Sequence, residues 1–291
     1  MLVLKSGREF TINMPYASII IRTKNEESGL KNLLESLKTQ TFKDYEIIVV
    51  DDSSTDSTVE IARNHGCSVY KITPGTFTFG HALNVGLEEA NGEVAVIVSA
   101  HCLPKDSKWI ELLVSEYSKK NNLAGVYGRQ VPFPDASPME KRGLLEAFPE
   151  GDSHGRFSNA NSSIRLSVWK ETKFDETLTG AEDFDWSTKV QDKGHIIEYQ
   201  PLATVFHSHK ERLKGVIERS YRETLGLINI KSPLIKKHSA FGYILRAIRS
   251  MALDYIFLVQ NPVSFKYLIS WTIRIPLYRM GTYYGQYKAT K

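Results

Sequence analysis

Three groups of polar residues stand directly after apolar segments, where their side chains could do chemistry. One is Ser99-Ala100-His101, a second is the acidic pair Asp51-Asp52, and a third is the pair Glu182-Asp183. Ionised carboxylates accept hydrogen bonds from ribose hydroxyls or take a proton from an attacking hydroxyl, and imidazole binds metal ions or transfers protons. We therefore treat all three groups as candidates for one binding or catalytic site.

His101 owes its position to the apolar run before it. Residues 94–98 are small or β-branched and show no polar alternation, which is typical of a strand buried on both faces. Pro104 prevents this strand from continuing. In an open parallel sheet, ligands bind beyond the carboxyl ends of the strands, so His101 is a candidate site residue. A histidine that only caps a loop would show the same pattern.

The pair Asp51-Asp52 follows a second apolar run at residues 45–50. Ionised carboxylates repel bare phosphate, so at the end of a strand they suit the N–H groups of a base or the hydroxyls of a ribose. An aspartate or serine in this position can also cap the next helix. We expect Asp52 to contact a ligand and Asp51 or Ser54 to fix the turn.

The elements that position these residues alternate between strand and helix over the first hundred residues. Apolar runs predict strands at 17–22, 45–50, 67–72 and 94–98, with amphipathic helices between them. This alternation predicts an α/β fold, with a parallel sheet between two layers of helices. Further strands are predicted at 124–131, 159–164 and 199–206, and further helices at 109–117, 166–172 and 181–193. Residues 132–158 are aperiodic and rich in Pro and Gly, so we expect a long loop that acts as a lid.

The composition is that of an ordinary globular chain. Of the 291 residues, 42% are hydrophobic and 24% are charged, which allows one large domain or two modest ones. The two cysteines give no disulfide framework and suit a reducing compartment. No apolar stretch reaches the length of a membrane span, and the first residues do not form a signal peptide. We expect a cytoplasmic protein.

Residues 231–291 carry the excess positive charge. They contain ten Lys/Arg and one acid, Asp254, a net charge of +9, whereas the preceding 230 residues carry 27 minus 32, or −5. Basic residues alternate with aromatic and aliphatic ones at helical spacing, which is typical of helices lying on an anionic membrane surface. Helices that complete the core or an oligomer interface are the alternative, and the segment has no nucleic-acid-binding signature. We predict an α/β domain at 1–210 and a basic amphipathic helical extension at 211–291, peripheral on the inner face of the cytoplasmic membrane.

Taken in order, the motifs resemble those of glycosyltransferase family 2, which has the GT-A fold. The resemblance covers about residues 15–210. The matching segments are Thr23-x-Asn25-Glu26, Val50-Asp51-Asp52-x-Ser54-x-Asp56, Ala82-x-Asn84-x-Gly86, Glu182-Asp183, and His207 or His209 near the last strand.

The resemblance implies a Rossmann-like, mixed and mostly parallel sheet flanked by helices. It implies a hexosyl- or deoxyhexosyltransferase that moves a sugar, with inversion, from a nucleotide-sugar to a hydroxyl of a glycan or lipid-linked acceptor, in bacterial surface polysaccharide synthesis. It places nucleobase and ribose contacts on Thr23, Glu26 and Asp52, and Asn84 near the donor. We expect Asp183, in the Glu182-Asp183 helix start, to be the base that deprotonates the acceptor. Acids that only favour a helix N-terminus are the alternative.

One departure from the family concerns the metal. The family has Asp-x-Asp at the end of the fourth strand, where a carboxylate holds a divalent ion against the donor diphosphate, and here Ser99-Ala100-His101 stands there. Three readings compete. In the first, His101 with His207 or His209, and Asp183 or Glu182, holds Mn²⁺ or a softer ion in place of Mg²⁺.

In the second reading, protonated histidines or the cations Arg129, Arg156 and those near 210–212 hold the diphosphate. In the third, the site has lost its metal and the protein is a non-catalytic nucleotide-sugar-binding or membrane scaffold protein. A sugar-nucleotide pyrophosphorylase is set aside because no glycine-rich phosphate loop follows the first strand.

Overall fold

The computed structural model describes residues 14–151, 157–209, 211–261 and 263–291. Its centre is an eight-stranded sheet in the order β3-β2-β1-β4-β7-β6-β8-β5. In chain order, the strands are β1 (Ala17–Thr23), β2 (Tyr45–Asp51), β3 (Ser68–Lys71), β4 (Val94–Ser99), β5 (Leu103–Pro104), β6 (Leu123–Val131), β7 (Asn161–Arg165) and β8 (Ile196–Phe206).

The sheet is mixed and mostly parallel, as predicted. Strand β1 pairs in parallel with β2 and β4, and β2 pairs in parallel with β3. Strand β7 lies antiparallel between β4 and β6, and β6 pairs in parallel with β8. Strand β4 ends at Ser99, and Leu103–Pro104 form only the two-residue strand β5, which pairs antiparallel with the end of β8.

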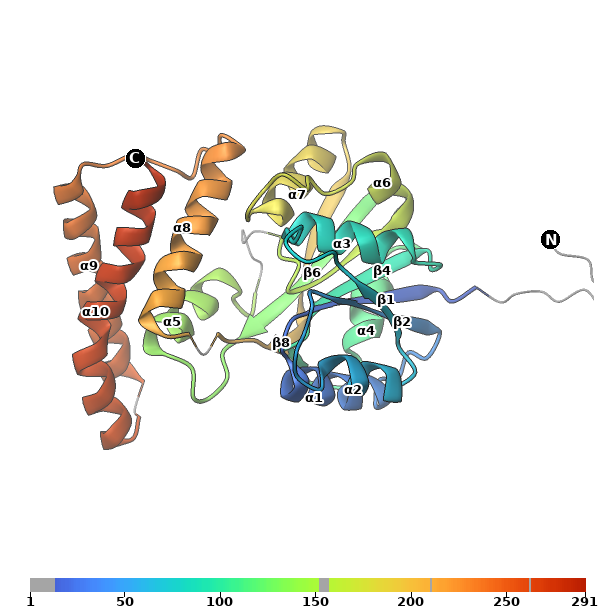
Figure 1. The fold of residues 1–291 in the computed structure, drawn as a ribbon, viewed down its shortest axis with the longest axis horizontal. Coiled ribbons are helices and arrows are strands. Elements are labelled where there is room, and N and C mark those ends of the chain that lie inside the picture. The colour runs from blue at the N-terminus through green and yellow to red at the C-terminus, as the bar shows by residue number, and fades with distance from the viewer. Residues whose placement is uncertain (1–13, 152–156, 210, 262) are drawn as a thin grey trace, which may run out of the picture.

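Helices cover both faces of the sheet (Figure 1). Alternate residues of β1 explain why: Ile19 and Ile21 belong to the core beneath α1 and α4, whereas Ile20 belongs to the core beneath α3 and α6. The helices are α1 (Glu27–Lys38), α2 (Thr58–Asn64), α3 (Phe79–Glu88), α4 (Trp109–Val114), α5 (Pro138–Ala147), α6 (Leu166–Glu171), α7 (Glu182–Asp192), α8 (Leu213–Asn229), α9 (Ala240–Gln260) and α10 (Phe265–Ala289).

The segment 132–158 was expected to be a loop, and this prediction is wrong in part. Helix α5 occupies its middle. The Ser137 hydroxyl accepts a hydrogen bond from the backbone N–H of Glu140 (3.2 Å), and Pro138 stands at the first helical position. Both are standard devices for starting a helix. Only one residue of the helix, Pro138, is buried, so no apolar stripe marks it in the sequence.

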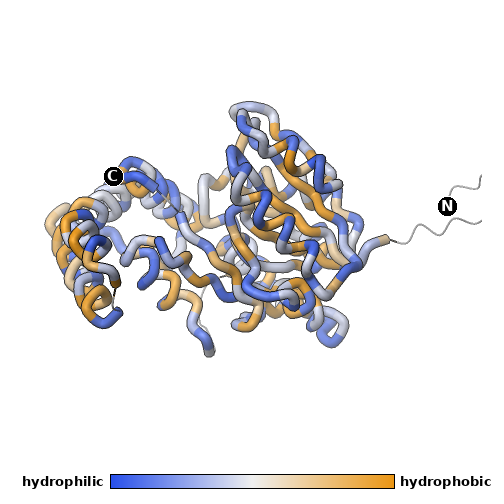
Figure 2. Tube along the Cα trace, turned by 90° about the horizontal axis from the view of Figure 1, so that it is seen from below, coloured by the Kyte–Doolittle hydropathy of each residue, from blue (hydrophilic) through white to orange (hydrophobic). Residues whose placement is uncertain are grey.

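Helices α8, α9 and α10 form a separate layer beside the sheet, and α10 packs against both of the others (Figure 1). Apolar and polar segments alternate along these helices (Figure 2). A fully buried carboxylate, Asp254 of α9, ties the layer to α5, because it accepts hydrogen bonds from Arg142 (2.9 Å) and Arg279 (2.5 Å). Within the described residues, no helix is both long enough and apolar enough to cross a bilayer.

Candidate functional site

The carboxyl ends of the parallel strands bring the predicted site residues to one edge. The strand register sets Thr23 beside Asp51, and Arg22 beside Ser99. His101 follows two residues after β4, and His207 follows β8 directly. We call this region, which also includes the Glu182-Asp183 pair described below, the carboxyl edge.

The two aspartates after β2 have different surroundings. The fully buried Asp51 accepts hydrogen bonds from the backbone N–H of Ser54 at 3.3 and 3.1 Å, so it fixes the turn, as the sequence predicts. Asp52 has one carboxylate oxygen 2.8 Å from the Lys24 ammonium, which is mostly exposed. The negative charge of Asp52 is therefore balanced by Lys24, whose side chain lies mostly in solvent.

The turns after β1 and β2 hold each other in place. Asn25 donates its backbone N–H to Ser54 Oγ (2.8 Å), and its side-chain oxygen accepts from the Thr55 N–H (2.7 Å). Asn25 (φ 53°) and Ser53 (φ 57°) both adopt the left-handed conformation, which L-residues adopt at a cost. Such strained residues cluster at functional sites, and here they flank Thr23 and Asp52.

Three histidines lie together at the carboxyl edge. The Nε2 atoms of His101 and His207 are 3.1 Å apart, and one ring nitrogen from each of His101, His207 and His209 lies within 4.8 Å of the others. The pairing of Leu103 with Phe206 between β5 and β8 places His101 beside His207. Histidines 106 residues apart in the chain thus meet through a two-residue strand.

Two of the rings have an oxygen partner at Nδ1, on the side away from the other histidines. His101 Nδ1 is 3.0 Å from Glu26 Oε1, and His207 Nδ1 is 2.7 Å from Gln130 Oε1. Both partner atoms are oxygens, so a proton on each Nδ1 satisfies both contacts, and a ring protonated there alone presents a lone pair at Nε2. Glu26, expected at the nucleobase, instead has one carboxylate oxygen on a histidine.

Burial keeps two of these histidines neutral. It lowers the pKa of His207 well below its usual range, with further lowering by His209 and His101. Burial, then the positive charge of Arg219, lowers the pKa of His209 to about 3. The proposal that these two residues act as protonated clamps for a diphosphate therefore loses support, whereas neutral imidazole is the form that binds metal.

The Glu182-Asp183 pair begins α7 at the same edge. Arg22 Nη1 lies 3.9 Å from Glu182 Oε1, and the same arginine stands beside Ser99 in the sheet. The backbone N–H of Asn159 lies 3.4 Å from Asp183 Oδ2, and the next carbonyl, of Ala160, accepts from the N–H of Ser99. The segment 159–160 thus connects the acidic pair to the end of β4.

Burial and, after it, the negative charge of Asp183 raise the pKa of Glu182 to about 7, although the positive charge of Arg22 opposes both. The pair therefore contains one carboxyl group that protonates near neutral pH beside a second carboxylate. Carboxyl groups whose environments differ in this way are typical of acid–base sites.

The backbone that presents this pair is strained and tightly packed. Ala181, which precedes Glu182, has φ 64°, a conformation that costs free energy for any residue with a Cβ. The preceding Gly180 carbonyl lies against Gly226 of α8, where an added Cβ would come within 2.1 Å of it. Helix α8 therefore fixes the position of the turn that carries the acids.

Several buried polar atoms of the carboxyl edge have no hydrogen-bond partner among the described residues. They are Arg22 Nε and Nη1, Thr23 Oγ1, Gln130 Nε2 and Asn159 Oδ1. Buried polar groups are nearly always paired in native proteins, so such a group points to a missing ligand or water. Sequence reasoning missed Arg22, Gln130 and Asn159. Two of them could have been found, because Arg22 and Gln130 are polar residues near the carboxyl ends of the apolar strands β1 and β6.

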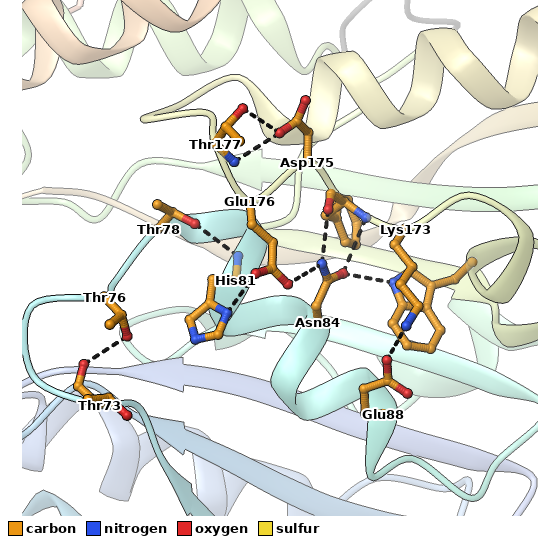
Figure 3. Close-up of polar contacts among 12 residues, drawn as sticks. Thr73, Thr76, Thr78, His81, Asn84, Glu88, Lys173, Asp175, Glu176 and Thr177 are labelled. Atoms are coloured by element: carbon orange, nitrogen blue, oxygen red, sulfur yellow. Dashed lines mark hydrogen bonds and ion pairs between the residues drawn. The ribbon is translucent and has the colours of Figure 1, made fainter.

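The structure corrects the prediction for Asn84. Its Nδ2 donates to Phe174 O (2.9 Å) and Glu176 Oε1 (2.8 Å), and its Oδ1 accepts from Trp169 Nε1 (3.0 Å) and Phe174 N (3.2 Å). Figure 3 shows Asn84 of α3 turned toward Glu176, which also contacts His81. All the hydrogen-bonding capacity of the amide is used, so Asn84 fixes the segment after α6 and has no free group for a donor.

Other predicted residues are placed as follows. Arg129 pairs with Glu150 (2.9 Å) and donates to Phe148 O (3.2 Å), so it holds the end of the α5 segment. Arg156 and Lys210 lie outside the described residues. Cys102 is buried, donates weakly to Ala160 O, and burial raises its pKa to about 12, which agrees with a packing role.

Comparisons with known proteins agree with this geometry. The family model described as "Glycosyl transferase family 2" matches residues 18–179. The chain is 28% identical over 244 residues to the O-antigen chain rhamnosyltransferase RfbN of Salmonella typhimurium, covering 76% of this chain and 74% of that protein.

Two solved structures share the GT-A fold. The mannosyltransferase PcManGT from Pyrobaculum calidifontis, in complex with GDP-Man and Mn²⁺, has a TM-score of 0.61 at 18% identity and covers 95% of this chain and 85% of its own. The glucosyl-3-phosphoglycerate synthase from Mycobacterium tuberculosis, in complex with Mn²⁺, UDP and phosphoglyceric acid, has a TM-score of 0.58 at 17% identity, covering 75% and 80%.

Proposed function

Because the chain belongs to glycosyltransferase family 2, we propose that it transfers a hexosyl or deoxyhexosyl group, with inversion, from a nucleotide-sugar to a hydroxyl of a glycan or lipid-linked acceptor. The name of the Salmonella relative supports a rhamnosyl group and a role in a surface polysaccharide. The observation that carries the proposal is the meeting of the Glu182-Asp183 pair, buried Arg22 and the histidines at one edge of the sheet.

Asp183 is the base in this proposal. An acceptor hydroxyl must lose its proton as it attacks the anomeric carbon from the face opposite the leaving nucleotide, and a positioned carboxylate takes that proton. Glu182, with its pKa raised to about 7, keeps its proton in a large fraction of molecules at neutral pH, which limits repulsion with Asp183. Arg22 supplies a buried positive charge for the developing diphosphate.

Thr23 and Asp52 bind the nucleoside in this proposal. The unpaired hydroxyl of Thr23 and the carboxylate of Asp52 lie at the ends of neighbouring strands. The donor set of the carboxyl edge also fits a divalent ion, because two ring nitrogens with lone pairs face each other at 3.1 Å. An ion held by His101 and His207 would supply positive charge against the donor diphosphate.

The test is turnover by the purified chain with UDP-, GDP-, dTDP- and CMP-sugars, including a rhamnose donor, measured as donor hydrolysis and as transfer. We expect Asp183→Asn to lower kcat by about 10²- to 10⁴-fold, the usual contribution of a general base. Asp192→Asn, at the exposed far end of the same helix, is the matched control and should leave kcat unchanged. Near-normal turnover of Asp183→Asn would remove it from the role of base. Donor binding without any turnover would favour a non-catalytic binding protein.

We also propose that α9 and α10 hold the enzyme on an anionic membrane surface. The two helices expose large apolar side chains, among them Val259 (82% exposed), Phe265 (76%) and Ile273 (68%). The same two helices also expose cations, including Arg246 of α9 and Arg274 of α10. Apolar side chains in the headgroup region and cations against anionic headgroups together bind a membrane interface.

Sedimentation with liposomes tests this surface. We expect the chain to bind vesicles rich in anionic lipid at low salt and to be released at high salt, because exposed charges are screened. Ile273→Glu should abolish binding, whereas Leu202→Glu on β8, an equally exposed residue (67%), should not. Binding that is indifferent to lipid charge, or a stable dimer buried on this face by light scattering, would contradict the proposal.

A further inference from the structure

We propose that His101, His207 and His209 form a three-nitrogen site for a divalent late transition metal ion, oriented by Glu26 and Gln130. This inference rests on the proposed function, because the ion would lie at the carboxyl edge, where we propose that the nucleotide-sugar donor binds. It differs from the family's pattern in its donor atoms, because nitrogen replaces the carboxylate oxygens of Asp-x-Asp.

The spacing of the nitrogens is that of ligands sharing one ion. A ring nitrogen binds such an ion at about 2.1 Å, so two nitrogens at angles between about 90° and 110° lie roughly 3.0–3.4 Å apart. The two Nε2 atoms of His101 and His207 are 3.1 Å apart. A nitrogen of His209 lies within 4.8 Å of both, so a small movement of its side chain would bring it to the same ion as a third ligand.

The outer hydrogen bonds orient two rings toward the ion. Glu26 accepts from His101 Nδ1 and Gln130 accepts from His207 Nδ1, which turns both Nε2 lone pairs inward. Metal-binding histidines characteristically donate their second N–H to a carboxylate or a carbonyl in this way. At 3.1 Å the two Nε2 atoms hold either a cation or one shared proton, and the metal titration below distinguishes the two.

The surrounding backbone holds this arrangement rigidly. Gly29 of α1 packs so closely on the turn after β4 that an added Cβ would lie 3.0 Å from Ala100 O and 3.1 Å from His101 Cα. His207 donates its backbone N–H to Val131 O on β6, next to Gln130. Ligands and orienting groups therefore stand on the sheet or directly at its ends, where a site is most precisely fixed.

The donor atoms decide which ion is favoured. Mg²⁺ prefers oxygen ligands, whereas imidazole suits cobalt, nickel and zinc, and affinity for nitrogen sites rises from Mn²⁺ toward these later metals. We expect Co²⁺ to bind more tightly than Mn²⁺, and at least about 100-fold more tightly than Mg²⁺.

Titration of the chelator-treated full chain with CoCl₂ tests the site, read by visible d–d absorption and by calorimetry. The expected result is one Co²⁺ per chain with an absorption spectrum of nitrogen ligation. His101→Ala and His209→Ala should abolish or weaken binding by more than 100-fold, whereas His81→Ala, outside the cluster, should not. The buried His207 is left unchanged because His207→Ala could fail to fold, and the variants of His101 and His209 test the site without it.

The orienting role has its own control. Glu26→Gln should weaken Co²⁺ binding by about 10- to 100-fold, as loss of such a partner usually does. Glu27→Gln, the neighbouring residue whose carboxylate binds Ser57 N, should leave it unchanged. No Co²⁺ uptake, or uptake that survives His101→Ala and His209→Ala, would overturn the inference and leave a shared proton between the rings.

This readout is independent of sugar transfer. Co²⁺ binding without transfer for any donor would retain the metal site and reject the proposed function. Sugar transfer by a chain that takes up no Co²⁺ would reject the metal site and retain the proposed function.

Discussion

Two polar clusters in this molecule are built in opposite ways. The Asn84 cluster, which joins α3 to the segment 169–176, uses every hydrogen-bonding position of the Asn84 amide. The carboxyl edge contains unpaired atoms on Arg22, Thr23 and Asn159, and two histidine Nε2 atoms that face each other at 3.1 Å. Both regions lie in the part of the chain that resembles the family, and both contain residues of its motifs.

The difference separates residues that hold the fold from residues available to a ligand. A satisfied buried network stabilises the folded state, because each broken bond leaves a partner unpaired in a region without water. An unsatisfied buried group costs stability until something binds it. Membership of a motif does not distinguish the two roles, whereas hydrogen-bond satisfaction does.

The largest effect on stability is expected from Asn84→Ala. The change leaves the Trp169 indole N–H and the Phe174 backbone N–H without acceptors, and Glu176 loses a donor. We expect the free energy of unfolding, measured with urea, to fall by about 3–5 kcal/mol. Asn64→Ala, at the exposed end of α2, should change it by less than about 0.5 kcal/mol. A loss below about 1 kcal/mol for Asn84→Ala would mean that the cluster does not stabilise the fold.

The sequence predicts the sheet well because of burial. Strands β1, β2 and β4 are covered on both faces, and such strands are continuous apolar runs that need no partner to be recognised. Helix α5 lacks this signal, since it buries little, and its start depends on a local cap at Ser137. The pattern of apolar residues in a sequence therefore predicts helices and strands that pack against a core, but not those that lie mostly at the surface.

The sequence predicts where the candidate residues lie along the strands and helices, but not which residues they contact. The motifs place Thr23, Asp52, His101 and the Glu182-Asp183 pair correctly at the ends of strands or at a helix start. The partners of Asn84, however, lie 85 to 92 residues further along the chain. No local pattern reveals that these partners occupy every hydrogen-bonding position of its amide.

The next prediction concerns Glu182 and the pH dependence of stability. Its pKa is raised from 4.5 to about 7 in the folded chain, so the folded state binds the proton more tightly than the unfolded state. The contribution of this carboxyl is fully present below about pH 4.5 and is lost as the pH rises through about 7. Glutamine remains neutral throughout this range. We expect Glu182→Gln to match the original chain near pH 4.5 and to be more stable by about 2–3 kcal/mol at pH 8.

Urea unfolding at a series of pH values measures this difference. Glu171→Gln, at the end of α6 and outside the edge, is the control and should show no such rise. A constant difference between Glu182→Gln and the original chain from pH 4.5 to pH 8 would place Glu182 in a solvated environment. The carboxyl edge would then lack a buried carboxyl group with a raised pKa, which is one of its differences from the Asn84 cluster.

The smallest effect, and the sharpest contrast, is expected within strand β1 itself. Thr23 at its carboxyl end has a buried hydroxyl without a partner, whereas Ser18 near its start donates to Glu46 (2.7 Å) and accepts from Gly92 N (2.9 Å). Thr23→Val should leave the free energy of unfolding unchanged or raise it by up to about 1 kcal/mol, and should weaken nucleotide-sugar binding by about 5- to 10-fold. Ser18→Ala should do the reverse, costing about 1–3 kcal/mol of stability while donor affinity stays constant. Calorimetric titration with the donor and urea unfolding of the same two proteins measure both quantities. If Thr23→Val destabilises the chain as Ser18→Ala does, its hydroxyl is paired in solution, and an unpaired atom at this edge no longer marks a ligand.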